Sequence, residues 1–138
     1  MEYAKLGKSG IEVSRLCVGC MSFGRPSEDF HEWTLNPNET EEIVKKALDL
    51  GINFFDTANT YSHGTSEEYL GRALKKNIAR NKVVIGTKVY FNEGHLSKEA
   101  VRREIDGSLK RLGTDYVDLY IIHRFDYTTP IEETMEAL

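Results

Sequence analysis

The sequence predicts an α/β fold of the parallel (β/α)8 TIM-barrel type, of which this chain supplies about four βα units after an N-terminal β-hairpin. Apolar runs begin near Arg15, Ile52, Lys82 and Tyr116, spaced 37, 30 and 34 residues apart, and a helical pattern follows each run. This alternation predicts parallel strands with right-handed crossovers, which suit a barrel or a doubly wound sheet. Two observations favour the barrel: no strand is followed by G-x-G-x-x-G, and polar residues gather at the strand ends.

Length and composition describe a single domain, residues 1–138, long enough to bury roughly two thirds of its unfolded surface. The 40% hydrophobic and 29% charged residues exclude the profile of a disordered chain. The net charge of -4 is spread along the sequence, which argues against a nucleic-acid partner. Without an apolar run of roughly 18 residues or an apolar signal core, we expect no membrane partner and a cytoplasmic location.

The elements follow in order from the N-terminus. The runs EYAKL and IEVSRL flank the turn-forming GKSG and predict the hairpin, and RLCVGC predicts the first strand of the sheet. A polar stretch over residues 22–37 predicts a long loop. Asn38 with Glu41 then predicts the capping box of a helix that Gly51 ends.

Three further units repeat the pattern with INFFD, KVVIGTK and DYVDLYIIH as strands. We expect Ser66 to cap the second helix, and Ser97 and Gly113 to begin and end the third. Thr129 and Pro130 fit the N-cap and first position of a fourth helix.

Cys17 and Cys20 form a C-x-x-C, a spacing that redox pairs use. On an extended strand, residues three apart point to opposite faces, so the two sulfurs diverge. We therefore interpret these cysteines as packing residues.

Four polar side chains stand at or just after strand ends: Asp56, Tyr61, Lys88 and His123. Each alone has a structural explanation as a loop cap, a solvated charge or a packed ring. At the carboxyl ends of parallel strands they would meet at the mouth that holds active sites in barrels. Together they form a proton-handling set, with a phenol as acid, an ammonium and a carboxylate beside it, and an imidazole to orient a carbonyl.

The same segments resemble the aldo-keto reductase family. Residues 51–74, GINFFDTANTYSHGTSEEYLGRAL, resemble the signature around its catalytic aspartate and tyrosine. VVIGTKV is similar to the strand that bears its lysine, and DYVDLYIIHRFD to the one that bears its histidine. LGKSGIEVSRLCVGCMSFG is similar to its opening hairpin and first strand, so the resemblance spans nearly the whole chain.

This resemblance implies an NAD(P)H-dependent oxidoreductase that reduces aldehydes or ketones to alcohols, with NADP expected in preference to NAD. Tyr61 would be the general acid, Lys88 and Asp56 would tune it, and His123 would orient the substrate. Trp33, in the long loop, is a second candidate for substrate contact, although a loop packed on its own aromatic side chains explains it equally well.

The family also places the nicotinamide beside the end of the first strand, here Gly19, Cys20 and Met21, and beside Asp56. Two other groups are expected to be merely solvated. One consists of the loop histidines His31, His63 and His95, whose spacing implies no metal site. The other is the basic face of the third helix, Lys98, Arg102, Arg103, Lys110 and Arg111.

A whole family member continues for another four βα units, which usually hold the far end of the cofactor. We therefore expect a truncated, cleaved or halved product with open edges at its first and fourth strands, completed by the C-terminal half or by a second copy. Two alternatives stay open: a regulatory or scaffold protein resembling potassium-channel β-subunits, and an inactive half-barrel.

Overall fold

The chain begins with an antiparallel hairpin in the computed structural model, which describes residues 1–138. Strand β1 (Tyr3–Lys5) pairs with β2 (Glu12–Ser14), as predicted. Asn53, just before the second strand of the main sheet, ties the hairpin to that sheet: its Oδ1 accepts from the Ser14 backbone N–H at 2.7 Å, and its Nδ2 donates to the Glu12 carbonyl.

The main sheet has four parallel strands, which confirms the predicted βα rhythm. These strands are β3 (Cys17–Gly19), β4 (Phe54–Asp56), β5 (Val84–Val89) and β6 (Leu119–Ile122). Their order in space, β3-β4-β5-β6, is their order in sequence, the arrangement of a barrel wall rather than a doubly wound sheet. β3 and β6 are its two edges, as expected.

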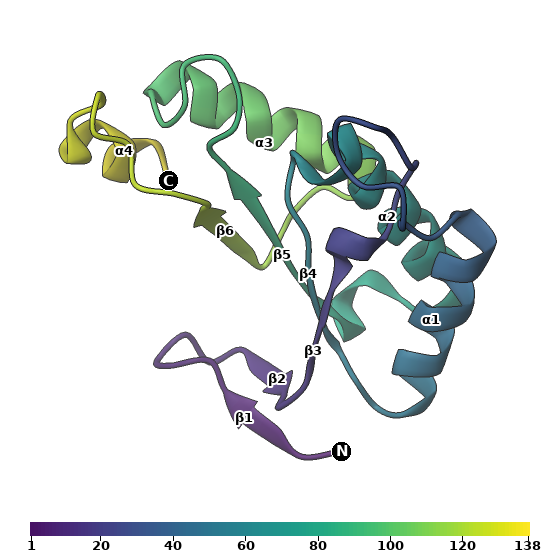
Figure 1. Ribbon diagram of the computed structural model, residues 1–138. Coiled ribbons are helices and arrows are strands. Elements are labelled where there is room, and N and C mark those ends of the chain that lie inside the picture. Colours follow the sequence, from purple (N-terminus) through teal and green to yellow (C-terminus); the bar gives the residue numbers. More distant parts are fainter.

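All four helices pack against one another or against one face of this sheet (Figure 1). They are α1 (Pro37–Asp49), α2 (Thr65–Asn77), α3 (Lys98–Leu112) and α4 (Ile131–Ala137). The core lies between the sheet and α1 and α2, where Phe55, Val44 and Leu70 are fully buried. None of these helices combines the length and the apolar composition that a membrane-spanning helix requires.

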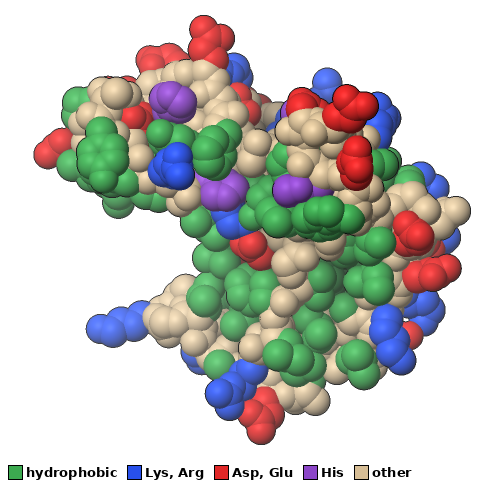
Figure 2. All heavy atoms as spheres, viewed as in Figure 1, with side chains coloured by type: hydrophobic (Ala, Val, Ile, Leu, Met, Phe, Trp, Pro, Cys, Tyr) green, Lys and Arg blue, Asp and Glu red, His purple; other side chains and the backbone are tan.

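The opposite face of the sheet is open. Figure 2 shows a hollow between the hairpin and the upper part of the molecule, lined largely by hydrophobic side chains. Because side chains alternate along a strand, the burial of Phe55 against the helices turns Phe54 and Asp56 toward this hollow. On β5 the same alternation turns Lys88 toward it.

The start of α1 differs from the sequence prediction. Asn36, not Asn38, is the N-cap: its side chain accepts from the backbone N–H groups of Asn38 and Glu39, and the Glu39 carboxylate accepts from the Asn36 backbone N–H. Pro37 occupies the first helical position, where its missing N–H costs nothing. Asn36 with Glu39 therefore forms the capping box that was assigned to Asn38 and Glu41.

Two other helix starts are also shifted. α2 begins after Gly64, and Ser66 lies inside the helix, where its buried hydroxyl donates to the Cys20 carbonyl at 2.6 Å. Pro130 is the N-cap of α4, and the hydroxyl of Thr129 donates instead to Asp126. The predicted boundaries of α3 are confirmed, with Ser97 as its N-cap and Gly113 in the left-handed conformation at its end.

Candidate active site

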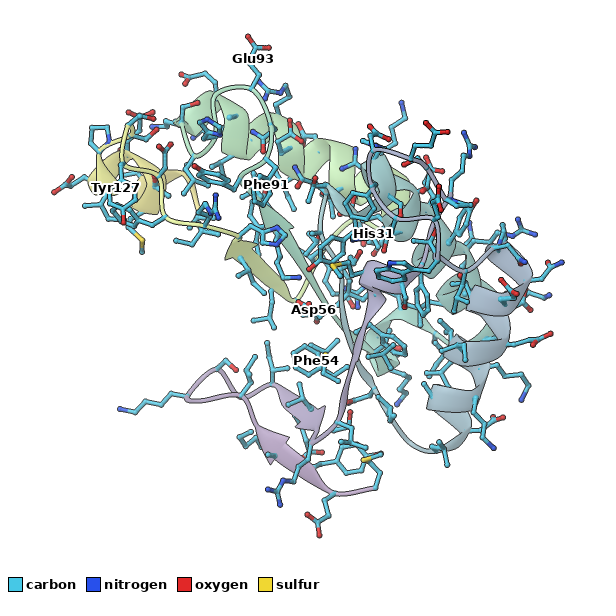
Figure 3. All side chains as sticks on the ribbon, viewed as in Figure 1. His31, Phe54, Asp56, Phe91, Glu93 and Tyr127 are labelled. Atoms are coloured by element: carbon cyan, nitrogen blue, oxygen red, sulfur yellow. The ribbon has the colours of Figure 1, made fainter.

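The open face of the sheet brings three of the four predicted side chains into direct contact. Lys88 Nζ lies 2.6 Å from Asp56 Oδ2, 3.1 Å from the phenolic oxygen of Tyr61 and 2.8 Å from the Thr57 carbonyl oxygen. Figure 3 shows Asp56 at the end of β4, beside the hollow. The side chains of Lys88 and Asp56 are 14% and 30% exposed, so water only partly screens their attraction.

The Lys88 ammonium uses all three of its N–H donors in this contact. An ammonium has three N–H donors and no acceptor, and the Lys88 ammonium has three oxygen partners. The Tyr61 oxygen therefore accepts from Lys88, which leaves its own O–H free to donate elsewhere. A phenol that accepts a charge-assisted hydrogen bond while its proton stays available can act as an acid.

His123 follows β6 and joins the group through ring contacts. Its ring centroid lies 5.6 Å from that of Tyr61 and 5.1 Å from that of Phe91, edge to face in both cases. Burial, together with the nearby positive charge of Lys88, lowers the pKa of His123, so the imidazole is neutral at neutral pH. Its Nδ1 is buried without a hydrogen-bond partner.

The backbone around Tyr61 is strained, a feature with no motif in the sequence. Ser62 and His63 both have left-handed backbone angles, with φ of 46° and 54°, and Gly64 follows at 89°. For residues other than glycine this conformation costs roughly 1–2 kcal/mol each. The residues 62–64, called here the Tyr61 turn, therefore depend on their surroundings to stay in place.

The ends of β3 and β4 bear the proposed cofactor contacts. Gly19 is the register partner of Asp56, and a Cβ at Gly19 would meet no atom within 4 Å, so this backbone is open to a flat ring. Met21 is 40% exposed. Cys20 differs, because the whole residue is buried in the core and its carbonyl oxygen accepts from the Ser66 hydroxyl.

The two cysteines diverge as expected. Cys17 is exposed, Cys20 is buried, and both are free thiols. Partial burial and the charge of Asp56 raise the pKa of Cys17 to about 11, so it is protonated at neutral pH. The reactive form of a redox cysteine is the thiolate, so this spacing does not make a redox pair.

Trp33 lies on an aromatic cluster within the long loop. It is 57% exposed and stacks on His31 with ring centroids 4.4 Å apart, and Phe30 contacts both His31 and His63. Of the loop histidines that were expected to be solvated, His63 and His95 are exposed, and His63 Nε2 in addition lies 3.1 Å from an oxygen of Asp29. His95 likewise stacks on Tyr90, and its Nδ1 lies 2.9 Å from the carbonyl oxygen of that residue.

Sequence reasoning missed a buried charge behind the site. Glu67 on α2 is fully buried; Thr87 Oγ1 donates to its Oε1, and Arg111 Nε donates to its Oε2 at 2.6 Å. Arg111 was assigned to the solvated face of α3, which is wrong: its side chain reaches across to α2 and neutralises Glu67. A Cβ on Gly64 would lie 2.7 Å from Arg111 Cδ, so this pair also packs against the Tyr61 turn.

Comparison with known proteins identifies relatives over almost the whole chain. The model of the Aldo/keto reductase family matches residues 15–138. Versiconal hemiacetal acetate reductase of Aspergillus parasiticus is 44% identical over 162 residues, covering 100% of this chain and 46% of the relative. A probable voltage-gated potassium channel subunit beta of Oryza sativa subsp. japonica is 38% identical, covering 100% of this chain and 42% of the relative.

Solved structures agree with the sequence relatives. The thermostable aldo-keto reductase Tm1743 superposes with a TM-score of 0.85 at 36% identity, over 99% of this chain and 48% of that one. Aldo-keto reductase AKR11C1 from Bacillus halodurans gives a TM-score of 0.83 at 36% identity, over 99% and 45%. The chain spans about half the length of the relatives it matches.

Proposed function

The chain belongs to the aldo/keto reductase family. We propose that it forms part of an oxidoreductase that uses NAD(P)H to reduce aldehydes or ketones to alcohols. The observation that carries the proposal is the contact of the Lys88 ammonium with the Tyr61 phenol, 3.1 Å apart, at the open end of the sheet. NADP is proposed in preference to NAD from the family resemblance.

In the proposed reaction, Tyr61 donates its proton to the carbonyl oxygen of the substrate. The phenolate that remains is stabilised by Lys88, since a unit charge about 4 Å away at an effective dielectric of about 20 is worth roughly 4 kcal/mol. Asp56 offsets part of that gain but keeps the ammonium charged and in place. The nicotinamide, when bound, supplies the hydride.

The remaining site residues bind and orient. The neutral imidazole of His123 would orient the carbonyl. Asp56, the exposed backbone of Gly19 and the exposed side chain of Met21 would hold the nicotinamide ring, with Cys20 beside them. Trp33 would contact the part of the substrate that extends under the long loop.

The direct test follows NADPH absorbance at 340 nm with a reactive aldehyde. Tyr61→Phe should lower kcat by about 10²–10⁴-fold, the range that general acids contribute, while NADPH binding is retained. Tyr69→Phe, which removes a phenol from α2, is the matched control and should keep wild-type turnover. Undiminished turnover in Tyr61→Phe would refute the assigned role.

The potassium-channel relative supports a second candidate, a regulatory or scaffold role. A tight NADPH complex with negligible turnover, together with a stable protein partner on pull-down, would favour it. The open face of the sheet raises a related question, whether a second copy or a C-terminal half completes the site. Sedimentation with and without NADPH would separate a self-associated cofactor binder from an inert half-barrel.

A further inference from the structure

The long loop after β3, residues 23–35, lies directly on the Tyr61 turn. Gly24 makes the closest approach: a Cβ built on it would lie 2.5 Å from Ser62 Cβ and 2.8 Å from Thr65 Oγ1. Its φ of 128° is itself a conformation that other residues rarely adopt. The long loop and the Tyr61 turn, about 40 residues apart in sequence, are thus in close contact at Gly24. Any side chain at this position would force the two segments apart.

Thr65 bridges the loop and the turn with one hydroxyl. Its Oγ1 donates to the Ser62 carbonyl oxygen at 2.7 Å and accepts from the Arg25 backbone N–H at 2.8 Å. Ser62 cannot hold itself, because its own Oγ is buried without a partner. The left-handed conformation of Ser62 is therefore held from outside, by Thr65 and by the packing of Gly24.

The outer end of the loop contacts the same turn. Asp29 Oδ2 lies 3.1 Å from His63 Nε2, and the Phe30 ring lies edge-on to the His63 ring with centroids 6.0 Å apart. Both left-handed residues of the turn thus have partners in the long loop. The contact between His63 and Asp29 is exposed, whereas Ser62 is buried and its hydrogen bond with Thr65 is partly buried, so Gly24 and Thr65 are expected to dominate.

We propose that the long loop positions the general acid, with Thr65 as the positioning residue that locks the Tyr61 turn. This inference rests on the proposed function of Tyr61. If the turn relaxes toward an ordinary helical conformation, the preceding phenol shifts away from Lys88. A misplacement of about 1 Å in a reacting group lowers turnover by as much as 10²-fold.

The test compares Thr65→Val, which keeps the shape but removes the hydroxyl, with Thr65→Ser, which keeps the hydroxyl. We expect Thr65→Val to lower kcat about tenfold or more, with the KM for NADPH changed less than about twofold. Thr65→Ser should restore kcat to within about twofold of wild type. Wild-type kcat in Thr65→Val, or an equal loss in Thr65→Ser, overturns the inference.

Tyr61→Phe, measured in parallel, separates the two proposals. If it loses turnover while Thr65→Val keeps it, the positioning inference fails and the proposed acid stands. If Tyr61→Phe keeps turnover, the proposed acid itself fails. Gly24→Ala is the second variant, should Thr65→Val not fold, and the same loss of kcat is expected.

Hydrogen exchange on the wild-type protein provides a test that needs no variant. The amide of His63 donates to the Thr60 carbonyl, and that of Gly24 to the Leu35 carbonyl. If the loop holds the turn, the two amides should open together as denaturant is added. Free exchange at His63 while Gly24 stays protected overturns the inference.

Discussion

The ammonium of Lys88 donates to the phenolic oxygen of Tyr61 across a separation of 27 residues in sequence. Asp56 and the Thr57 carbonyl occupy its other two donors, so Lys88 is held from one side by β4 and contacts the phenol on the other. The effect of the Lys88 charge can therefore be measured separately from the effect of holding Lys88 in place. Turnover should respond differently when the positive charge of Lys88 is removed and when the negative charge of Asp56 is removed.

Lys88→Met should lower kcat more than Asp56→Asn does. Lys88→Met removes the charge that is proposed to stabilise the phenolate, a kind of loss that typically costs about 10²–10³-fold in kcat. Asp56→Asn leaves the ammonium charged and still held by the Thr57 carbonyl, so a smaller loss is expected. Turnover with NADPH and an aldehyde measures both, with Lys82→Met, an exposed lysine just before β5, as the control. Equal losses in the two variants would contradict the separate roles.

The stability of the protein should depend on His123 at mildly acidic pH. Its pKa is lowered in the folded state by burial and by Lys88, whereas an unfolded histidine titrates near 6.5. Between these two pKa values the unfolded chain binds more protons. The free energy of unfolding is therefore fully retained above pH about 6.5 and falls as pH decreases through the folded pKa.

Urea unfolding at several pH values between about 5 and 8 measures this dependence. His123→Gln removes the titrating group, so the decline in unfolding free energy toward acidic pH should be weaker than in the wild type. An identical decline in both proteins would show that His123 has no lowered pKa in the folded state.

The residues at the strand ends were predictable from sequence, and the way they are held was not. Asp56, Lys88 and His123 end apolar runs, and parallel strands bring such ends together whatever lies between them. The strain at Ser62 has no local signal, because it depends on how closely Gly24 approaches from a distant loop. The sequence therefore predicts which groups meet but not what fixes their orientation.

The wrong assignments have the same physical origin. Asn36 and Asn38 both precede a glutamate by three residues, and only the position of Pro37 at the first helical site decides between them. Arg111 lies on a helix face that looks solvated, and its pairing with Glu67 depends on how α2 and α3 cross. When two local sequence patterns are equivalent, tertiary contacts determine which of them forms the observed structure.

Glu67→Ala should destabilise the fold strongly. It leaves the partly buried Arg111 without its partner and the buried Thr87 hydroxyl without its acceptor. Removal of one member of a buried ion pair typically costs about 3 kcal/mol or more. Glu68→Ala, at the exposed neighbouring position, should change the unfolding free energy by about 0.5 kcal/mol or less. Chemical denaturation compares the two, and equal small effects would show that Arg111 finds solvent instead.

Two glycine-to-alanine changes on adjacent helices should affect thermal stability differently. Gly71 lies where α2 meets the end of α3, and a Cβ there would be 2.1 Å from the Leu112 carbonyl oxygen. At Gly107 on α3 the nearest atom is Arg111 Nη1, a side-chain nitrogen 3.1 Å away that needs to move only slightly. Both changes gain about 1 kcal/mol of helix propensity.

At Gly71 this gain is outweighed, because the backbone of α3 must move and overpacking of this kind costs about 1–3 kcal/mol. Gly71→Ala should therefore lower the midpoint of thermal unfolding, and Gly107→Ala should raise it or leave it unchanged. If Gly71→Ala stabilises the protein as Gly107→Ala does, then α2 and α3 do not cross with their backbones in contact. The Glu67–Arg111 pair, which spans the same two helices, would then need a different explanation.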